Sequence, residues 1–225
     1  MKRSEINKTI RKMEKLIAEN HFALPPFTDW TPESWQKKGQ ECREIKDNML
    51  GWDVTDYGEG HFDTLGLALI TIRNGNAGNP RYAKSYAEKL IMSDENQISP
   101  MHFHFKKMED IINRGGGNMQ MRLYNSNEDG SFADTDVKVQ SDGVWYTVPA
   151  GSVLTFEPGQ SITLSPGLYH EFWAEEGKGP VLIGEVSETN DDNTDNRFYE
   201  PLARFAEIEE DEAPYRLLCN EYPEL

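Results

Sequence analysis

Residues 102–109 read His-Phe-His-Phe-Lys-Lys-Met-Glu, and a further histidine, His170, follows much later in the chain. On a strand, residues i and i+2 face the same side, so His102 and His104 would present both imidazoles to one point in space. The residues between His104 and Glu109 let the chain bend and bring this carboxylate back to the histidines, whereas His170 must arrive from a separate strand. The pattern predicts a metal site with His102, His104, Glu109 and His170 as its ligands.

The donor set limits which ion this site would hold. Three imidazole nitrogens and one carboxylate are borderline-to-hard ligands, which suit Mn²⁺, Fe²⁺, Co²⁺ or Ni²⁺ with water at the open positions, and Zn²⁺ also fits. The chain has 5 histidines, and a His-x-His pair alone would be a weak signal. Glu109 and the sequence around His170 strengthen the signal, but they leave the choice among these ions open.

Length, charge and cysteine usage narrow the class of protein. With 225 residues, the chain can form one large β domain with helical additions. Its formal net charge of -16 would repel a phosphate backbone and an anionic bilayer, so we expect neither nucleic acid nor membrane as a partner. Cys42 and Cys219 are expected to be free thiols. Because the first residues lead into polar sequence rather than an apolar signal core, we expect the protein in the reducing cytoplasm.

Helices are expected mainly in an N-terminal region, residues 1–58. Residues 4–20 carry apolar side chains at helical spacing among charged ones, which is the pattern of an amphipathic helix. A second helix is predicted to begin after Thr31, a suitable cap, with Pro32 at its first position, and to continue to Met49. A third, short helix is predicted for residues 82–91. These helices should pack outside a sheet.

The rest of the chain is predicted to be mainly β. Residues 65–72 indicate a buried strand, and further strands are expected at residues 119–124, 136–140, 144–148, 152–156, 161–164, 169–174 and 180–186. Short strands at close spacing, punctuated by glycine and proline, favour a sandwich or barrel such as a double-sheet jelly roll. The polar residues 187–196 are expected to form a loop, and the charge run at residues 207–212 to form a solvated surface.

The ligand pattern on this series of strands resembles the cupin superfamily. The first cupin motif has the form His-x-His, a few residues, Glu and then a glycine, and here it corresponds to His102, His104, Glu109 and Gly116. The second motif runs from a glycine through Pro-x-Gly to a histidine. This chain matches it, without the residue between proline and glycine, at Gly159, Pro166, Gly167 and His170.

The resemblance implies a mainly β fold in one domain, residues 1–225. A single cupin jelly-roll barrel would span about residues 60–190. The N-terminal helices and a C-terminal extension, residues 191–225, would pack outside it.

Over its whole length the chain resembles the bacterial D-lyxose isomerases, which are single-cupin enzymes of about this length. The similarity is carried by residues 22–27 (Phe-Ala-Leu-Pro-Pro-Phe), 30–32 (Trp-Thr-Pro), 102–117, 166–173, 196–199 (Asn-Arg-Phe-Tyr) and 214–216 (Pro-Tyr-Arg). The resemblance implies a sugar isomerase that interconverts D-lyxose with D-xylulose and D-mannose with D-fructose. It also implies a homodimer and Mn²⁺ as the usual cofactor, held by His102, His104, Glu109 and His170.

Such an isomerase needs a base that reaches C1 and C2 of the sugar. Glu185 is the candidate, because it lies in the apolar run at residues 181–186, where a carboxylate is unusual unless it points to a polar site. Strand alternation alone also allows it an outward position. If Glu185 is not the base, Glu109 is the next candidate. Lys107 could reach the sugar oxygens, and Lys106 would take this role if the turn is irregular.

Substrate binding is predicted for Lys89, Lys107, Glu185, Asp195 and Arg197, with a structural role as the alternative for Lys89, Asp195 and Arg197. The acidic composition and the lack of a phosphate-cradling glycine loop favour a neutral, unphosphorylated monosaccharide as the substrate. Two other functions stay open. The same ligands could hold Fe in a cupin dioxygenase, or the metal could merely stabilise a non-catalytic sugar-binding cupin.

Overall fold

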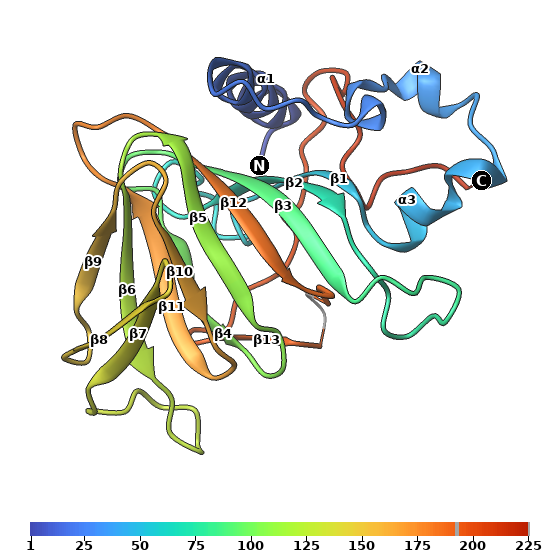
Figure 1. Ribbon diagram of the computed structural model, residues 1–225. Coiled ribbons are helices and arrows are strands. Elements are labelled where there is room, and N and C mark those ends of the chain that lie inside the picture. The colour runs from blue at the N-terminus through green and yellow to red at the C-terminus, as the bar shows by residue number, and fades with distance from the viewer. Residues whose placement is uncertain (192–193, 225) are drawn as a thin grey trace.

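The protein is built around two antiparallel sheets (Figure 1). The computed structural model describes residues 1–191 and 194–224. In this part of the chain the larger sheet has 8 strands, in the order β1 (Gly51–Thr55), β2 (Leu67–Arg73), β3 (Tyr86–Ser93), β12 (Val181–Glu188), β5 (Glu109–Gly116), β10 (Ser161–Leu164), β7 (Val137–Ser141) and β8 (Val144–Val148). The smaller sheet has 5 strands, in the order β13 (Asn196–Phe198), β4 (Ser99–His104), β11 (Leu168–Ala174), β6 (Met119–Asn125) and β9 (Val153–Phe156).

The main hydrophobic core lies between these two sheets, as in a double-sheet jelly roll. Leu69, Ile91 and Ile183 of the larger sheet belong to the same buried cluster as Met121 and Phe172 of the smaller one, and each is at most 4% exposed. Burying such a side chain contributes about 1.5–3 kcal/mol to folding. Because alternate residues of a strand share a face, polar residues two positions from these core residues also lie between the sheets.

Helix α1 (Arg3–Glu19) covers the outer face of the larger sheet (Figure 1). Its residues Ile6, Ile10 and Met13 recur at helical spacing, so they form one apolar stripe, and all three are fully buried. They pack in one cluster with Ile70 of β2 and Leu90 of β3. The predicted N-terminal amphipathic helix is confirmed, and the larger sheet is therefore buried on both faces where α1 covers it.

The remaining helices are short: η1 (Pro26–Asp29), α2 (Pro32–Trp35), η2 (Gln40–Cys42) and α3 (Arg43–Asp47). The hydroxyl of Thr31 accepts a hydrogen bond from the Ser34 backbone N–H, and Pro32 follows it at the first helical position, as predicted. Yet the predicted continuous helix to Met49 is wrong, because Gly39 adopts an extended conformation between α2 and η2. Among the described residues, no helix combines the length and apolar character needed to cross a bilayer.

The prediction of a helix over residues 82–91 is also wrong, since residues 86–93 form β3. Leu90 and Met92 face α1 while Ile91 faces the other sheet, so the strand is apolar on both sides and lacks the alternation that identifies a strand. Three strands were not predicted at all: β1, within the expected helical region, β5 and β13. The expected loop at residues 187–196 includes the end of β12 and the start of β13, and residues 192 and 193 lie outside the described residues.

Candidate metal centre and active site

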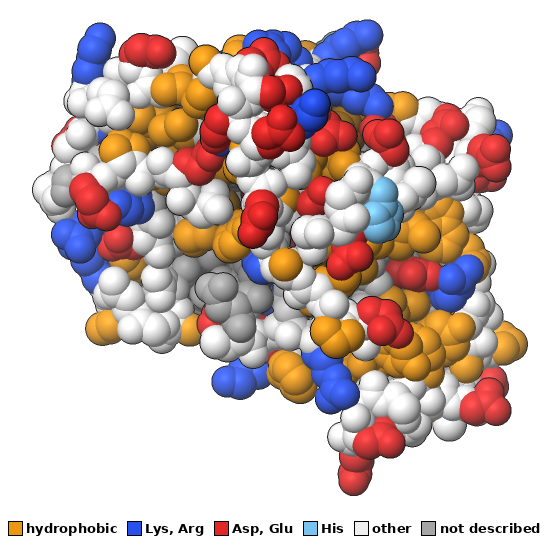
Figure 2. All heavy atoms as spheres, turned by 180° about the vertical axis from the view of Figure 1, so that it is seen from behind, with side chains coloured by type: hydrophobic (Ala, Val, Ile, Leu, Met, Phe, Trp, Pro, Cys, Tyr) orange, Lys and Arg blue, Asp and Glu red, His pale blue; other side chains and the backbone are white. Residues whose placement is uncertain are grey.

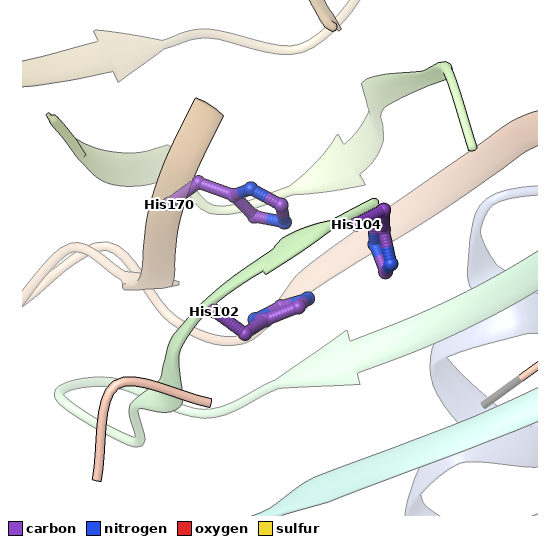
Figure 3. Close-up of side chains that lie close together, drawn as sticks. All are labelled: His102, His104 and His170. Carbon is purple, nitrogen blue, oxygen red and sulfur yellow. The ribbon is translucent and has the colours of Figure 1, made fainter. Parts of the chain in front are cut away.

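Three histidines meet between the two sheets. His102 and His104 lie two positions apart on β4 and so share its inner face, and His170 on β11 is the direct pairing partner of His102. Their side chains point toward one another from the two strands (Figure 3). One ring nitrogen of each lies within 4.8 Å of one ring nitrogen of the others. The structure thus brings together the three histidines predicted as metal ligands.

Backbone carbonyls fix which ring nitrogen faces the centre. Nδ1 of His102 lies 2.7 Å from the carbonyl oxygen of Pro100, and Nδ1 of His170 lies 3.0 Å from that of Leu168. A nitrogen that faces a carbonyl must carry the proton, so Nε2 of each ring keeps its lone pair for the centre. Burial, together with the neighbouring His170 and His104, holds the pKa of His102 well below its ordinary value, which favours the neutral imidazole that metals bind.

Glu109, the first residue of β5, adds an oxygen to these nitrogens. Its Oε1 lies 3.2 Å from Nε2 of His104 and 3.2 Å from Nε2 of His170. Burial would raise the pKa of Glu109, but the charge of Lys107 and the contacts with His104 outweigh it, so the pKa lies well below its ordinary value. A buried carboxylate oxygen therefore faces ring nitrogens at short range, and Nε2 of His170 makes no hydrogen bond with a described residue. Converging lone pairs of this kind fit a divalent cation.

A second cluster of charged groups lies beside this centre. Nζ of Lys107 is 2.7 Å from Oε2 of Glu109 and 3.1 Å from Oε1 of Glu185. Nζ of Lys89 is 3.2 Å from the same oxygen of Glu185, since Lys89 and Glu185 are paired across β3 and β12. All four residues are at most 4% exposed. Two cations and two anions compensate one another here, which makes the burial of all four tolerable.

Two polar side chains that the sequence did not suggest complete this cluster. Oδ1 of Asn190 accepts hydrogen bonds from Lys89 at 2.7 Å and from Lys107 at 3.1 Å. The hydroxyl of Ser187 donates to Oε1 of Glu185 at 3.1 Å. Ser187 lies two positions after Glu185 on β12, so strand alternation could have found it, whereas the position of Asn190 depends on a bend after the strand.

Asp195 and Arg197, which the sequence suggested as sugar contacts, make other interactions. The carboxylate of Asp195 accepts the backbone N–H groups of Lys106 and Lys107, and so shapes the turn that carries Lys107. Arg197 donates to the backbone carbonyl of Asp129. Lys107 points into the cluster while Lys106 is exposed, which is the arrangement favoured from the sequence.

One cavity is lined by both groups of residues. Besides the three histidines, the lysines and the glutamates, its wall includes residues absent from the predicted site: Tyr57, Asn196, Phe198 and Arg204. Along β13, Asn196 and Phe198 face one side and Arg197 faces the other. The face that this short strand turns inward therefore decides which of its side chains reach the cavity. Arg204 is paired there with Asp53, their atoms being 2.6 Å apart.

Known proteins with similar sequences cover nearly the full chain. The D-lyxose/D-mannose isomerase of Serratia proteamaculans is 49% identical over 223 residues, which is 99% of this chain and 98% of the relative. The D-lyxose/D-mannose isomerase of Escherichia coli O157:H7 is 48% identical over the same lengths.

Solved structures share the fold at much lower identity. An L-ribose isomerase variant of Acinetobacter sp. DL28, in complex with L-ribose, superposes with a TM-score of 0.62 at 14% identity and covers 91% of this chain and 94% of its own. The L-ribose isomerase of Cellulomonas parahominis with L-ribose gives a TM-score of 0.59 at 15% identity, over 93% and 98%. These likenesses confirm the predicted mainly β fold.

The family model described as D-lyxose isomerase matches residues 1–222. This match and the two relatives, which are 48–49% identical, extend over nearly the full length of the chain and are not limited to its central sheets. The chain belongs to the D-lyxose isomerase family.

Proposed function

We propose that this protein is a metal-dependent isomerase that interconverts D-lyxose with D-xylulose and D-mannose with D-fructose. Its family makes it an aldose–ketose isomerase, and the aldoses are those in the names of its relatives. The observation that carries the proposal is the single cavity in which a three-histidine, one-glutamate centre adjoins a buried pair of lysines and Glu185. An isomerase of this kind needs both parts, because one stabilises charge on oxygen and the other moves protons.

The charges of the cavity favour a neutral sugar. Each cation in its wall faces a carboxylate: Lys89 faces Glu185, Lys107 faces Glu109, and Arg204 faces Asp53. A phosphate group would therefore meet acceptors as well as donors. Acidic side chains are also spread over the surface seen in Figure 2, in line with the formal net charge of -16. Such a surface repels anionic substrates rather than attracting them.

His102, His104, Glu109 and His170 would hold the metal, for which we propose Mn²⁺, with Co²⁺, Fe²⁺, Ni²⁺ or Zn²⁺ as possible substitutes. When bound, such an ion would supply positive charge that stabilises the negative charge developing on the sugar oxygens. Glu109, His102 and His170 would contribute fixed ligand atoms, because Lys107 and two backbone carbonyls already hold these side chains in place.

Proton transfer falls to Glu185 and Lys107. The Glu185 carboxylate takes the proton from C2 of the open-chain aldose while the Lys107 ammonium gives a proton to O1, so that an enediol forms. Lys107 then takes the proton from O2 and Glu185 returns its proton to C1, which yields the ketose and restores both side chains. Lys89, 3.2 Å from Glu185, keeps the carboxylate oriented throughout.

Removal of the metal tests the proposal directly. We expect metal-stripped protein to leave D-lyxose and D-mannose unchanged, and added Mn²⁺ to restore formation of D-xylulose and D-fructose, followed by proton NMR. In D₂O, transfer through Glu185 should place deuterium at C1 of the ketose, whereas a direct hydride shift would not. No conversion with any divalent ion would sink the proposal.

A histidine pair provides the matched control. His102→Ala should lower metal content and abolish conversion, whereas His61→Ala should do neither, because His61 is exposed and lies outside the cavity lining. Oxygen uptake with Fe and no aldose turnover would instead favour a dioxygenase. Sugar binding without turnover would favour a non-catalytic cupin.

Two aspects of the resemblance stay predictions: the homodimer and the location in the cytoplasm. The free edge of the larger sheet, β8, carries exposed apolar side chains, Val144, Trp145 and Tyr146. A second copy of the chain would be one way to cover them.

A further inference from the structure

We propose that Asn196 binds the sugar hydroxyl on C3 or C4 and helps to select the substrate, an inference that rests on the proposed isomerase function. Asn196 begins β13, the edge strand of the smaller sheet, and its direct pairing partner on β4 is His104. Paired residues of antiparallel strands project their side chains to the same face. The side chain of Asn196 therefore stands beside a predicted metal ligand, and it lines the cavity.

The amide oxygen of Asn196 lacks a hydrogen-bond partner among the described residues. Its Oδ1 is buried and makes no hydrogen bond with any residue that the structure describes. By contrast, the fully buried Asn113 donates to the carbonyls of Gly117 and Phe156, and its oxygen accepts from the Gly115 N–H. A buried polar atom without a partner is costly, and a bound ligand is one way to satisfy it. On two histidines that line the same cavity, Nδ1 of His104 and Nε2 of His170 also make no hydrogen bond with a described residue.

A hydroxyl is the ligand that suits this amide. A hydroxyl both donates and accepts, so it can bind Asn196 whichever way the amide oxygen and nitrogen are oriented. Glu185 and Lys89, beside the predicted reaction at C1 and C2, belong to the larger sheet, whereas Asn196 belongs to the smaller one. The sugar would lie between the sheets, so we assign to Asn196 a hydroxyl beyond C2.

The part of the cavity wall that contains Asn196 is also the part that can move most easily. The cavity offers water-sized molecules about 50 Å³, much less than the roughly 300–1,000 Å³ of typical ligand pockets. A sugar must therefore push part of the wall aside. β13 has only 3 residues and lies at the edge of its sheet, paired with β4 alone among the described strands. Movement there breaks few backbone hydrogen bonds and opens space next to the Asn196 amide.

Deoxy sugars test the contact. We expect Asn196→Leu, which keeps the size of the side chain but removes its polar atoms, to lower kcat/KM for D-mannose by about ten- to a hundredfold. The parental enzyme should lose a similar factor with 3-deoxy-D-mannose or with 4-deoxy-D-mannose. With whichever analogue lacks the contacted hydroxyl, Asn196→Leu should lose little more, because the contact is already gone. Asn196→Ser should show the same pattern if the leucine variant folds poorly.

The controls separate this contact from a structural effect. Asn125→Leu makes the same chemical change outside this cavity and should keep parental kcat/KM and metal content. Equal factors lost by Asn196→Leu with D-mannose and with both analogues would overturn the assignment, as would parental kinetics.

Calorimetric titration with D-mannose distinguishes this inference from the proposed function. If the parental protein binds the sugar without converting it, the function fails, while weaker binding by Asn196→Leu still supports the contact. If the parental protein converts the sugar and Asn196→Leu is unchanged in both assays, the contact alone fails. If the parental protein neither binds nor converts any sugar, both fail.

Discussion

At the scale of single residues, one carboxylate oxygen is surrounded by donors. Oε1 of Glu185 lies 3.1–3.2 Å from Nζ of Lys89, Nζ of Lys107 and the hydroxyl oxygen of Ser187. Oε2 takes part in none of these three contacts. This arrangement anchors the side chain through one oxygen and presents the other as the proton acceptor, so orientation and basicity belong to different atoms of one group.

Glu185→Gln should therefore keep the position of the side chain and remove the base. We expect kcat to fall by about 10²–10⁴-fold while metal content stays parental, which elemental analysis of the purified variant checks. Glu188→Gln is the matched control on the same strand, because Glu188 is exposed and should leave kcat unchanged. Near-parental turnover by Glu185→Gln would make Glu109 the leading candidate for the base.

At the scale of elements, the sequence predicted those parts whose pattern is local. The His-x-His pair, the helix at residues 3–19 and the strand starting at Met119 follow from spacing alone, and the structure has each of them. β3 could not be predicted, because its apolar residues on both faces reflect burial by α1, a distant element. Lys89 was consequently expected on a helix, although on β3 it faces Glu185.

The sequence also could not predict which face of β13 points toward the cavity. In a strand of 3 residues a shift by one position exchanges the two faces. The sequence suggested Asp195 and Arg197 as sugar contacts, whereas Asn196 and Phe198 line the cavity. Pairing with β4 sets this orientation, since Asn196 stands opposite His104. This orientation could be known only from the pairing of β13 with β4 in the structure.

The C-terminal segment that packs on α2 provides a pH test at this scale. Tyr222 stacks on Trp35 and donates its hydroxyl to the carbonyl of Leu50. Burial raises the pKa of Tyr222 well above its ordinary value. A raised folded-state pKa means that its contribution to stability is complete below the unfolded pKa of about 10 and is lost as the pH rises toward the folded value.

Tyr222→Phe should cost about 1 kcal/mol of unfolding free energy at pH 8, the worth of one hydrogen bond. This cost should shrink from pH 10 to pH 11, because the parental protein then loses stability through the ionisation of unfolded Tyr222 and the variant does not. Urea unfolding across this range measures the difference. A difference that stays constant with pH would contradict the assignment.

At the scale of the whole molecule, the N-terminal and C-terminal segments contact each other. Arg3, at the start of α1, is 1% exposed and forms ion pairs with Glu210 and Glu221. The backbone of Glu209 also exchanges hydrogen bonds with Met1 and Arg3. The charge run at residues 207–212 is largely exposed, as predicted, yet Glu210 pairs with Arg3 and Asp211 accepts hydrogen bonds from Ser4 of the N-terminal helix. The C-terminal segment thereby clasps the helix that covers the larger sheet, and Arg204 in the cavity wall belongs to the same segment.

Arg3→Met should loosen this clasp. Removing one partner of a fully buried ion pair costs roughly 3–5 kcal/mol, but the Glu210 and Glu221 side chains are 56% and 21% exposed and can regain water, so we expect about 2 kcal/mol in urea unfolding. Cleavage by protease near residues 207–216 should quicken as well. Lys15→Met on the same helix breaks only an exposed pair with Glu19 and should cost no more than about 0.5 kcal/mol. Equal losses from both variants would mean that α1 is held by its apolar stripe alone, and that the ends of the chain are joined without contributing to stability.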